Sequence, residues 1–319
     1  MINIDYFSNS RTEFFGLAFH FVKLINQDNK KLIRFNVLTT ADKVDFFNEF
    51  NTGELGFEYN VVPFKDGFNY TDKLKHVLSL DGDYSIKMDE DCIINNHIWD
   101  YMITNANVLD NPDNLLLSPM LSTSQPSCDE FIKGFLSETD RDIIHNHFLN
   151  QKMPNGLFGV NYEPLNEFTI NADKWSPDAF YLGLDKIPTD TKGMHPIRIS
   201  YNAQTTLNDM IVTNVDKLTA KGSYGVIELD RPYFTINMFM MRTSLWKEIF
   251  DKFGGTYDEI AISQHKKATN TKFLFVENGY GIHTMYNTIY GNQNKWGIGG
   301  VDSVQKEIKF INDLKEIIL

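Results

Sequence analysis

The first 120 residues alternate short apolar runs with longer stretches of helical periodicity. The apolar runs are rich in β-branched and aromatic residues, which predicts strands, and the intervening stretches repeat apolar residues at three- and four-residue steps, which predicts helices. The predicted strands are 2–7, 32–40, 57–64, 83–88 and 114–120, and the predicted helices are 11–26, 41–50, 69–80 and 93–106. Strands separated by helices of this length predict an α/β, doubly wound and mostly parallel sheet covered on both faces.

The pattern changes between residues 121 and 230. Pro, Asn, Gly and aromatic residues are scattered there without a clear period, which predicts long ordered loops and short strands. Regular patterns return with predicted strands at 233–242 and 272–283 and with predicted helices at 244–250, 257–268 and 303–319, the last of them amphipathic. Aromatic-rich loops over a rigid sheet commonly hold a substrate, so we expect this region to bind one.

Composition narrows the class of protein. The chain has 319 residues and is 42% hydrophobic, which is enough for a large core. No apolar run approaches the roughly 18 residues that a membrane span needs, and the start of the chain lacks a cationic segment followed by an apolar one, so we expect a cytoplasmic protein. Cys92 and Cys128 are too few for a disulfide scaffold and are predicted to be buried reduced thiols.

The charge is unevenly distributed. The net charge is −12, and residues 1–150 carry 12 Lys and Arg against 23 Asp and Glu, whereas residues 151–319 carry 18 against 19. An acidic first half repels polyanions, so the basic footprint of a nucleic-acid-binding protein is missing. A phosphate ligand bound through a divalent cation is still compatible with this charge, because the cation reverses the local sign.

Three consecutive acids follow the fourth predicted strand, in the stretch "GDYSIKMDEDC". In a parallel sheet, ligands bind beyond the carboxyl ends of the strands. In an extended segment residues i and i+2 point the same way, so Asp89 and Asp91 are expected to face one point while Glu90 faces elsewhere. Two carboxylates facing one point suit a hard cation that arrives with a diphosphate. The alternative is an ordinary solvated turn, which is the commoner origin of such triplets.

The run "DKLKHVLSLDGDYSIKMDEDC" resembles the glycosyltransferases of the GT-A fold, in particular the inverting ones with an Asp-x-Asp motif. The later run "INMFMMRTSLWKEIFDKFGGTYDEIAISQHKKATNTKFLFVENGYGIH" is similar to the acceptor-side segment of the same family. The resemblance implies a metal-dependent transfer of a sugar from a nucleotide-sugar, a UDP-sugar, to the hydroxyl of a glycan or small molecule. It also implies that 1–120 binds the nucleotide-sugar and that 121–319 holds the acceptor and the catalytic base, within one continuous domain.

The same resemblance implies roles for individual acids and for one histidine. Asp89 would contact the ribose or a metal-bound water, and Asp91 would be the direct ligand of Mn²⁺ or Mg²⁺. His283 would complete the metal ligands, and an imidazole suits Mn²⁺ better than Mg²⁺. Asp258 would be the catalytic base, with Glu259 as the neighbouring candidate. Acids in the first turn of a helix are also favoured by the helix dipole, which is the structural alternative for this pair.

Further residues are candidates for binding the nucleotide. The family often places a cation near the diphosphate at the position of Lys73. Glycines and asparagines around two large side chains in "HTMYNTIYGNQNKWGIGG" suggest a loop that closes over the diphosphate. Family members often carry an Asp pair after the second strand, where this chain has "TTAD" instead. The candidates beside Lys73 are Asn9, Arg11, Thr39 and Asp66, which follow predicted strands, and Lys295 and Trp296 in the loop.

Three alternatives stay open from the sequence. A bacteriophage-type glycosyltransferase that modifies hydroxymethylated DNA bases fits the composition, and a local basic face would then have to form in the second half of the chain. A nucleotidyltransferase also places Asp-x-Asp at a sheet edge, but it usually begins with a glycine-rich basic loop that "DYFSNSRTEF" does not supply. A non-catalytic sugar-binding module would leave the acids as turns.

Overall fold

The structure is a computed structural model of the chain. It describes residues 1–8, 11–65, 70–124, 126–148, 152–154, 167–169, 201–229, 237–253, 258–284 and 302–319.

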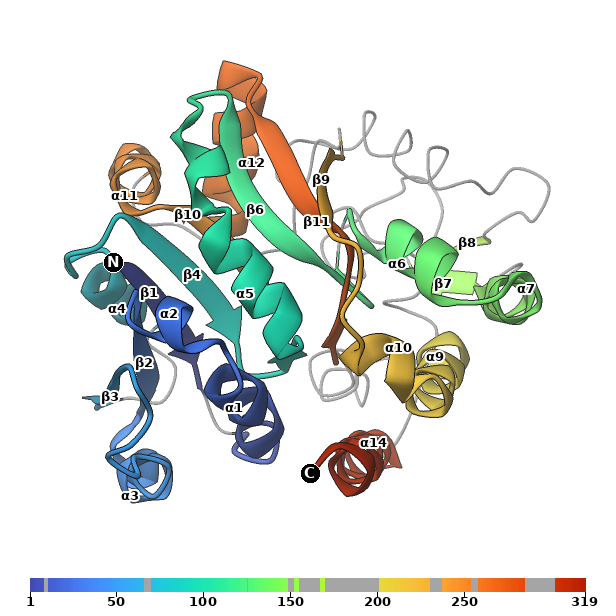
Figure 1. Ribbon diagram of the computed structural model, residues 1–319. Coiled ribbons are helices and arrows are strands. Elements are labelled where there is room, and N and C mark those ends of the chain that lie inside the picture. Colours follow the sequence, from blue (N-terminus) through green and yellow to red (C-terminus); the bar gives the residue numbers. More distant parts are fainter. Residues whose placement is uncertain are drawn as a thin grey trace.

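Four parallel strands form the first half of the sheet, in the order β3-β2-β1-β4 (Figure 1). They are β1 (Ile2–Phe7), β2 (Ile33–Thr40), β3 (Glu58–Phe64) and β4 (Tyr84–Asp89). The connections between them contain α1 (Phe15–Lys23), α2 (Gln27–Lys30), η1 (Ala41–Lys43), α3 (Val44–Asn48) and α4 (Tyr70–Val77). This half is the doubly wound, parallel arrangement that the sequence predicts.

The sheet continues beyond β4 through a strand of opposite direction. β10 (Met238–Arg242) lies antiparallel between β4 and β6 (Asn114–Leu121), and β6 pairs in parallel with β11 (Lys272–His283). Two short strands complete the sheet as antiparallel partners of β11, namely β5 (Cys92–Ile93) and β9 (Gly225–Glu228). Because β10 is reversed, β6 and β11 run in the same direction as β4. The end of β11 therefore reaches the same edge of the sheet as the end of β4.

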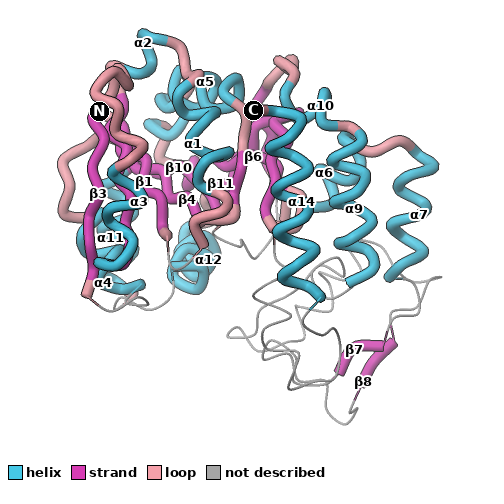
Figure 2. The backbone as a smooth tube through the Cα atoms, turned by 90° about the horizontal axis from the view of Figure 1, so that it is seen from below, coloured by secondary structure: helices cyan, strands magenta, loops and turns pink. Residues whose placement is uncertain are grey.

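Helices cover both faces of the sheet and build two hydrophobic cores. One core contains Tyr6, Phe35 and side chains of α1 and of α5 (Asn96–Thr104). The other contains Phe7 and Leu38 with side chains of α4, α11 (Thr243–Lys252) and α12 (Asp258–Thr269). Figure 2 shows α1 and α5 on one side of the strands and α4 and α12 on the other. The strands are apolar on both faces for this reason.

The prediction of loops and short strands for 121–230 is wrong for residues 128–148 and 201–219, and residues 155–166 and 170–200 lie outside the described residues. The described part contains four helices, α6 (Cys128–Phe135), α7 (Glu138–Phe148), α9 (Tyr201–Thr213) and α10 (Val215–Thr219), beside the short strands β7 (Lys152–Pro154) and β8 (Glu167–Thr169). Their apolar residues pack into the first core, with Phe131, Leu207 and Leu218 buried. α6 buries Cys128, Phe131, Ile132 and Phe135 at three- and four-residue steps, and α9 buries Ala203, Leu207 and Ile211 at four-residue steps, so both helices carry a helical apolar period.

The predicted helix at 11–26 is longer than the observed one. α1 ends at Lys23, and Asn26 then caps α2, its side chain accepting a hydrogen bond from the backbone of Asn29. Among the other elements, the 3-10 helix η2 (Ala106–Asp110) precedes β6. The predicted amphipathic helix at the end of the chain is α14 (Asp302–Ile318), which packs beside α9. In the described residues, no helix is long and apolar enough to cross a membrane.

Gly281 in β11 lies where three groups crowd the backbone. A Cβ at this position would lie 2.5 Å from Ile94 Cγ2, 2.9 Å from Leu121 Cδ2 and 3.1 Å from the Ile93 carbonyl oxygen. We expect Gly281→Ala to lower the free energy of unfolding by about 1–3 kcal/mol, because β11 must shift against β5 and β6. Urea denaturation followed by circular dichroism measures this change.

Gly16 in α1 provides the matched control, because a Cβ there meets no atom within 4 Å. Gly16→Ala is expected to stabilise the protein by about 0.5–1 kcal/mol through helix propensity. Equal effects of the two substitutions would contradict the packing of β11 described above.

Candidate functional site

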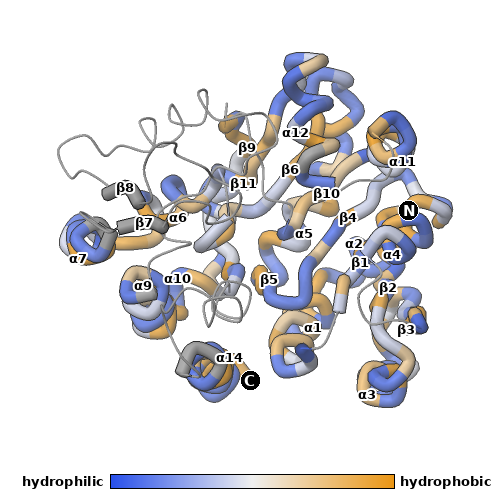
Figure 3. The backbone as a smooth tube through the Cα atoms, turned by 180° about the vertical axis from the view of Figure 1, so that it is seen from behind, coloured by the Kyte–Doolittle hydropathy of each residue, from blue (hydrophilic) through white to orange (hydrophobic). Residues whose placement is uncertain are grey.

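The acidic turn after β4 lies directly beside the end of β11. Asp89 ends the strand, Glu90 and Asp91 form a turn, and Cys92 begins β5, where it pairs with His283. This pairing brings Nε2 of His283 to 3.5 Å from Oδ1 of Asp91. In Figure 3, the chain is coloured hydrophilic at the turn and becomes hydrophobic in β5. Two residues separated by 192 positions in the sequence thus meet at the carboxyl edge of the sheet.

The turn changes the direction in which the three acids point. Alternation along an extended strand predicts Asp89 and Asp91 together and Glu90 apart. The structure instead places Glu90 and Asp91 on the same partner, Arg11, because the chain leaves the extended conformation after Asp89. The expectation for Glu90 was therefore wrong. Asp89 and Asp91 still act on each other electrostatically, since the charge of Asp91 contributes to raising the pKa of Asp89.

Arg11 binds three carboxylates. Its Nε donates to Glu90 Oε1 at 3.2 Å, its Nη2 to Asp91 Oδ2 at 2.6 Å and its Nη1 to Glu307 Oε1 at 2.8 Å. The side chain is 12% exposed and its guanidinium lies 5.1 Å from the ring centroid of Phe14. Burial works to lower the pKa of Arg11, but the three acids overcome this and hold it above its usual value. Arg11 was predicted to line the nucleoside pocket, and in the structure its guanidinium binds the acids at the carboxyl edge of the sheet.

This arrangement shifts the pKa of Asp91 and the pKa of Glu307 in opposite directions. Burial works against ionisation of Asp91, but His283 and Arg11 overcome it and lower the pKa of Asp91. Burial raises the pKa of Glu307 to about 7, in spite of Arg11. Thr284 links the two acids, because its hydroxyl donates to Glu307 Oε1 at 2.7 Å and its backbone N–H donates to the Asp91 carbonyl oxygen at 3.2 Å. Asp91 is thus an ionised, fixed carboxylate.

Asp91, Cys92 and His283 bring their potential ligand atoms within 4.8 Å of one another. Nδ1 of His283 lies 2.8 Å from the hydroxyl of Thr123, which fixes the ring and leaves Nε2 directed at Asp91. Burial raises the pKa of Cys92 far above its usual value, so the thiol stays protonated. One carboxylate oxygen and one imidazole nitrogen are ligands that Mn²⁺ accepts, and the oriented imidazole is typical of metal-binding histidines. Both free cysteines are buried, as predicted.

A second cluster connects Asp89 to the predicted base. Nζ of Lys87 donates to Asp89 Oδ1 at 2.5 Å, and the hydroxyl of Tyr70 donates to Asp258 Oδ2. Burial works to lower the pKa of Lys87, but the charges of Asp89 and Asp258 raise it, so the ammonium lies near both acids. Burial raises the pKa of Asp258 to about 7, and Lys87 and Tyr70 partly oppose this. Burial likewise raises the pKa of Asp89 to about 6.

Asp258 is therefore a buried carboxyl group that ionises near neutral pH. It lies in the first turn of α12 and accepts a hydrogen bond from the backbone N–H of Glu259 at 3.1 Å. A general base works best when its pKa is close to the working pH. Glu259 is less buried than Asp258, so Asp258 is the better placed of the two candidates.

Lys73 and Thr39 lie at the same edge of the sheet. Lys73 is fully buried and donates from Nζ to the Ser8 carbonyl oxygen at 2.7 Å. Burial lowers the pKa of Lys73 to about 8, with Glu90 and Asp89 opposing. Thr39, near the end of β2, is also fully buried, and its hydroxyl has no hydrogen-bond partner among the described residues. Asn9, Asp66, Lys295 and Trp296 lie outside the described residues.

Four residues that contact the candidate site residues were not predicted from the sequence: Tyr70, Lys87, Thr123 and Glu307. Lys87 carries a recognisable signal, because it is a charged residue inside a strand that is expected to be apolar on both faces. Glu307 carries a similar one, since it lies three residues after Val304 and four before Ile311 on the apolar stripe of the last helix. Tyr70 and Thr123 carry none.

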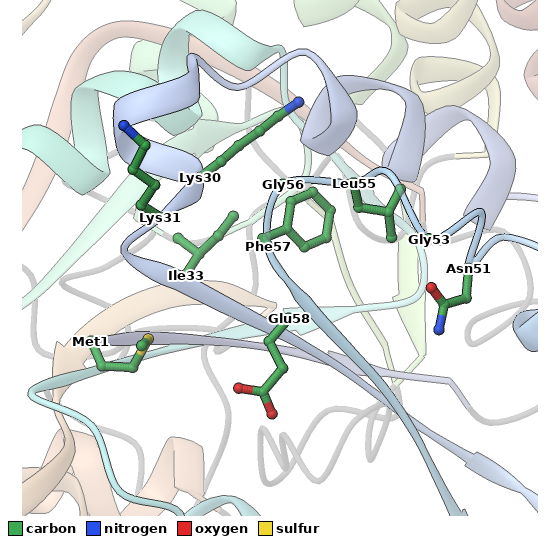
Figure 4. Close-up of a pocket in the computed structure, with 10 residues that line it drawn as sticks. All are labelled: Met1, Lys30, Lys31, Ile33, Asn51, Gly53, Leu55, Gly56, Phe57 and Glu58. Carbon is green, nitrogen blue, oxygen red and sulfur yellow. The ribbon is translucent and has the colours of Figure 1, made fainter.

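A pocket of about 560 Å³ lies at the opposite edge of the sheet, where β1, β2 and β3 begin (Figure 4). Met1, Ile33 and Glu58 line it together with Lys30 and backbone around Gly53. Its lining shares no residue with the acid cluster among the described residues. The candidate site is therefore the carboxyl edge of the sheet, where parallel α/β sheets usually bind ligands.

Comparison with solved structures finds similarity to enzymes that use nucleotide-sugars. The mannosyltransferase PcManGT from Pyrobaculum calidifontis, in complex with GDP-Man and Mn²⁺, aligns over 88% of this chain and 56% of that chain, with 8% identity and a TM-score of 0.45. TarS 1–349 from S. aureus aligns over 98% of this chain and 70% of that chain, with 9% identity and a TM-score of 0.38. Its complex with UDP-GlcNAc aligns over 38% and 34%, with 12% identity and a TM-score of 0.29.

The mannosyltransferase is a glycosyltransferase, which is the class of enzyme that the sequence resembles. The chain spans only 56% of the length of the mannosyltransferase. No family model matches the chain, and no curated protein matches it. At identities of 8–12% and TM-scores below 0.5, these similarities do not assign a function, and the residues of the site itself are the basis for one.

Thr123→Val is expected to lower the free energy of unfolding by about 1–3 kcal/mol, because it leaves Nδ1 of a buried histidine without its partner. Thr123→Ser, which keeps the hydroxyl, is the control and should lose less than half of that amount. Urea denaturation of the three proteins checks this. Equal stability of the valine variant and the wild type would show that Thr123 does not hold His283.

Proposed function

We propose that this chain is a metal-dependent glycosyltransferase that moves a sugar from a nucleotide-sugar, a UDP-sugar, to an acceptor hydroxyl with inversion. The observation that carries the proposal is the facing pair of Asp91 Oδ1 and His283 Nε2, 3.5 Å apart at the carboxyl edge of the sheet, with the far side of each group held by another residue. Asp91 and His283 would hold Mn²⁺. When bound, the metal supplies positive charge that stabilises the departing diphosphate.

The residues of the first 120 positions would bind the donor. We propose that Lys73, a buried cation near Asp89 and Glu90, approaches a phosphate of the donor. The hydroxyl of Thr39, which has no hydrogen-bond partner among the described residues, is proposed to bind the nucleoside. Asp89 is 28% exposed, which leaves it accessible to the ribose. Asn9, Asp66, Lys295 and Trp296 are proposed as further donor contacts on the basis of the sequence.

Asp258 would take the proton from the acceptor hydroxyl as the oxygen attacks the anomeric carbon. Tyr70 and Lys87 support this role, because both favour the charged form of the carboxyl that must act as a base. The acceptor would then bind over residues 121–319, and a glycan or a small hydroxyl compound is the expected class. The two buried free cysteines support a cytoplasmic location.

Calorimetric titration with UDP and, in parallel, GDP tests the proposal. We expect Mn²⁺ to tighten the binding of one of them by at least about tenfold, because the diphosphate needs the metal to approach an acidic edge. Asp91→Asn should abolish both this effect and turnover, whereas Asp113→Asn, at an exposed acid, should change neither. Asp258→Asn should keep nucleotide binding and lose transfer. Nucleotide binding that is independent of metal in the wild type would contradict the proposal.

The rate of transfer should rise with pH through about 7, because Asp258 must lose its proton to act and burial raises its pKa to about 7. Tyr70→Phe removes a hydrogen bond to the charged carboxylate, so the rising limb should move upward by about one pH unit. The pH dependence of kcat for sugar transfer, measured for both proteins, checks this shift. If Tyr70→Phe lowers kcat at every pH without shifting the pH at which kcat rises, Tyr70 has a purely structural role.

A further inference from the structure

Arg11 and the candidate metal pair share one carboxylate. Nη2 of Arg11 holds Oδ2 of Asp91 at 2.6 Å, while Oδ1 of the same group faces Nε2 of His283 at 3.5 Å. A cation held by Oδ1 and Nε2 would therefore be separated from the guanidinium by a single carboxylate. All three side chains are at most 12% exposed, so water screens their charges weakly.

Arg11 is also fixed in this position. Glu90 and Glu307 hold its Nε and Nη1, its backbone N–H donates to Glu90 Oε2 at 3.1 Å, and the ring of Phe14 lies beside the guanidinium. The guanidinium cannot leave Asp91 without also giving up its ion pairs with Glu90 and Glu307. A metal that binds next to it must accept the repulsion of a fixed positive charge.

We propose that Arg11 is a built-in counter-cation that disfavours metal binding until a diphosphate is present, so that metal and nucleotide bind cooperatively. The inference rests on the proposed function of this site. The three carboxylates attract a metal ion, and the guanidinium beside them reduces this attraction. A diphosphate that binds the metal adds negative charge, which offsets the repulsion between the metal and the guanidinium. Such coupling is reciprocal, because each ligand raises the affinity for the other by the same factor.

The role of Glu307 follows from the same balance of charges. It belongs to α14, accepts from both Arg11 and Thr284, and does not contact the facing pair itself in the described contacts. Its charge counteracts that of Arg11. Glu307 is therefore a positioning residue that sets how strongly Arg11 opposes the metal.

Titration of Mn²⁺ alone, followed by the electron paramagnetic resonance signal of the free ion, tests the inference. Arg11→Gln should bind Mn²⁺ at least about tenfold more tightly than the wild type in the absence of nucleotide. For Arg11→Gln, the dissociation constant of Mn²⁺ without nucleotide divided by that with saturating UDP or GDP should be smaller than for the wild type by a similar factor. Arg11→Gln that binds Mn²⁺ no more tightly than the wild type overturns the proposal.

Two further variants test the proposal if Arg11→Gln does not fold, which circular dichroism would show. Glu307→Gln removes an opposing negative charge and should weaken the binding of Mn²⁺ alone by about threefold or more. Arg11→Gln combined with Glu307→Gln restores the formal charge and should bind Mn²⁺ within about threefold of the wild type. Unchanged affinity in Glu307→Gln would also overturn the proposal.

The experiment separates this inference from the proposed function. If the wild type binds neither UDP nor GDP in the presence of Mn²⁺, the proposed function fails, whatever Arg11→Gln does to Mn²⁺ alone. If the nucleotide binds with Mn²⁺ but Arg11→Gln does not change the affinity for Mn²⁺ alone, only the role of Arg11 fails.

Discussion

The ion pairs of Arg11 hold the candidate site together. One guanidinium joins the segment after β1, the turn after β4 and helix α14 through Glu90, Asp91 and Glu307. Charges that are this deeply buried are stable only with partners, and loss of one partner from a buried ion pair typically costs about 3–5 kcal/mol. The acids of the turn are thus part of the interior of the protein and not a solvated surface cluster. Ion pairs with Arg11, a residue from a distant part of the chain, offset the free-energy cost of burying these acids.

The direction of the strands explains why a late histidine meets an early aspartate. β10 runs opposite to β4, so the strands beyond it return to the direction of β4 and end at the same edge of the sheet. β5 then pairs with the last residues of β11 and fixes His283 opposite Cys92. The same edge receives Lys73 from α4 and Asp258 from α12. The chemistry of the site therefore follows from sheet topology, which brings together residues that are far apart in sequence.

The elements that could be predicted from the sequence were those with a strong local period. The strand at residues 2–7 and the strand at residues 272–283 have the predicted bounds, because apolar and aromatic runs leave little choice of structure. The helices between residues 121 and 230 were missed although two of them carry an apolar period, because these periods are short and lie among scattered Pro, Asn and Gly residues that are typical of loops. Asp91 and His283 were predicted as neighbours through a resemblance to a family, and physical reasoning from spacing alone would not have joined them.

Prediction from the sequence was limited in the same way for the residues of the site. Alternation placed Glu90 on the wrong side because it assumed that the strand continued through the acids, whereas a turn begins at Glu90. The buried Lys87 and Glu307 could have been noticed, because each places a charge on an apolar face. The partner of each charge could not, since a pattern of residues along the chain contains no information about which distant side chain lies opposite.

The contact between Arg11 and Glu307 spans 296 positions of the chain. A polypeptide emerging from the ribosome can pair β1 with β2 and β4 long before α14 exists, and it must then carry Arg11 against two carboxylates with the third still missing. Contacts of such long range form slowly, because the chain loses entropy before they stabilise it. The acidic edge therefore reaches its mature electrostatic state only after α14 has been synthesised and has packed against Arg11.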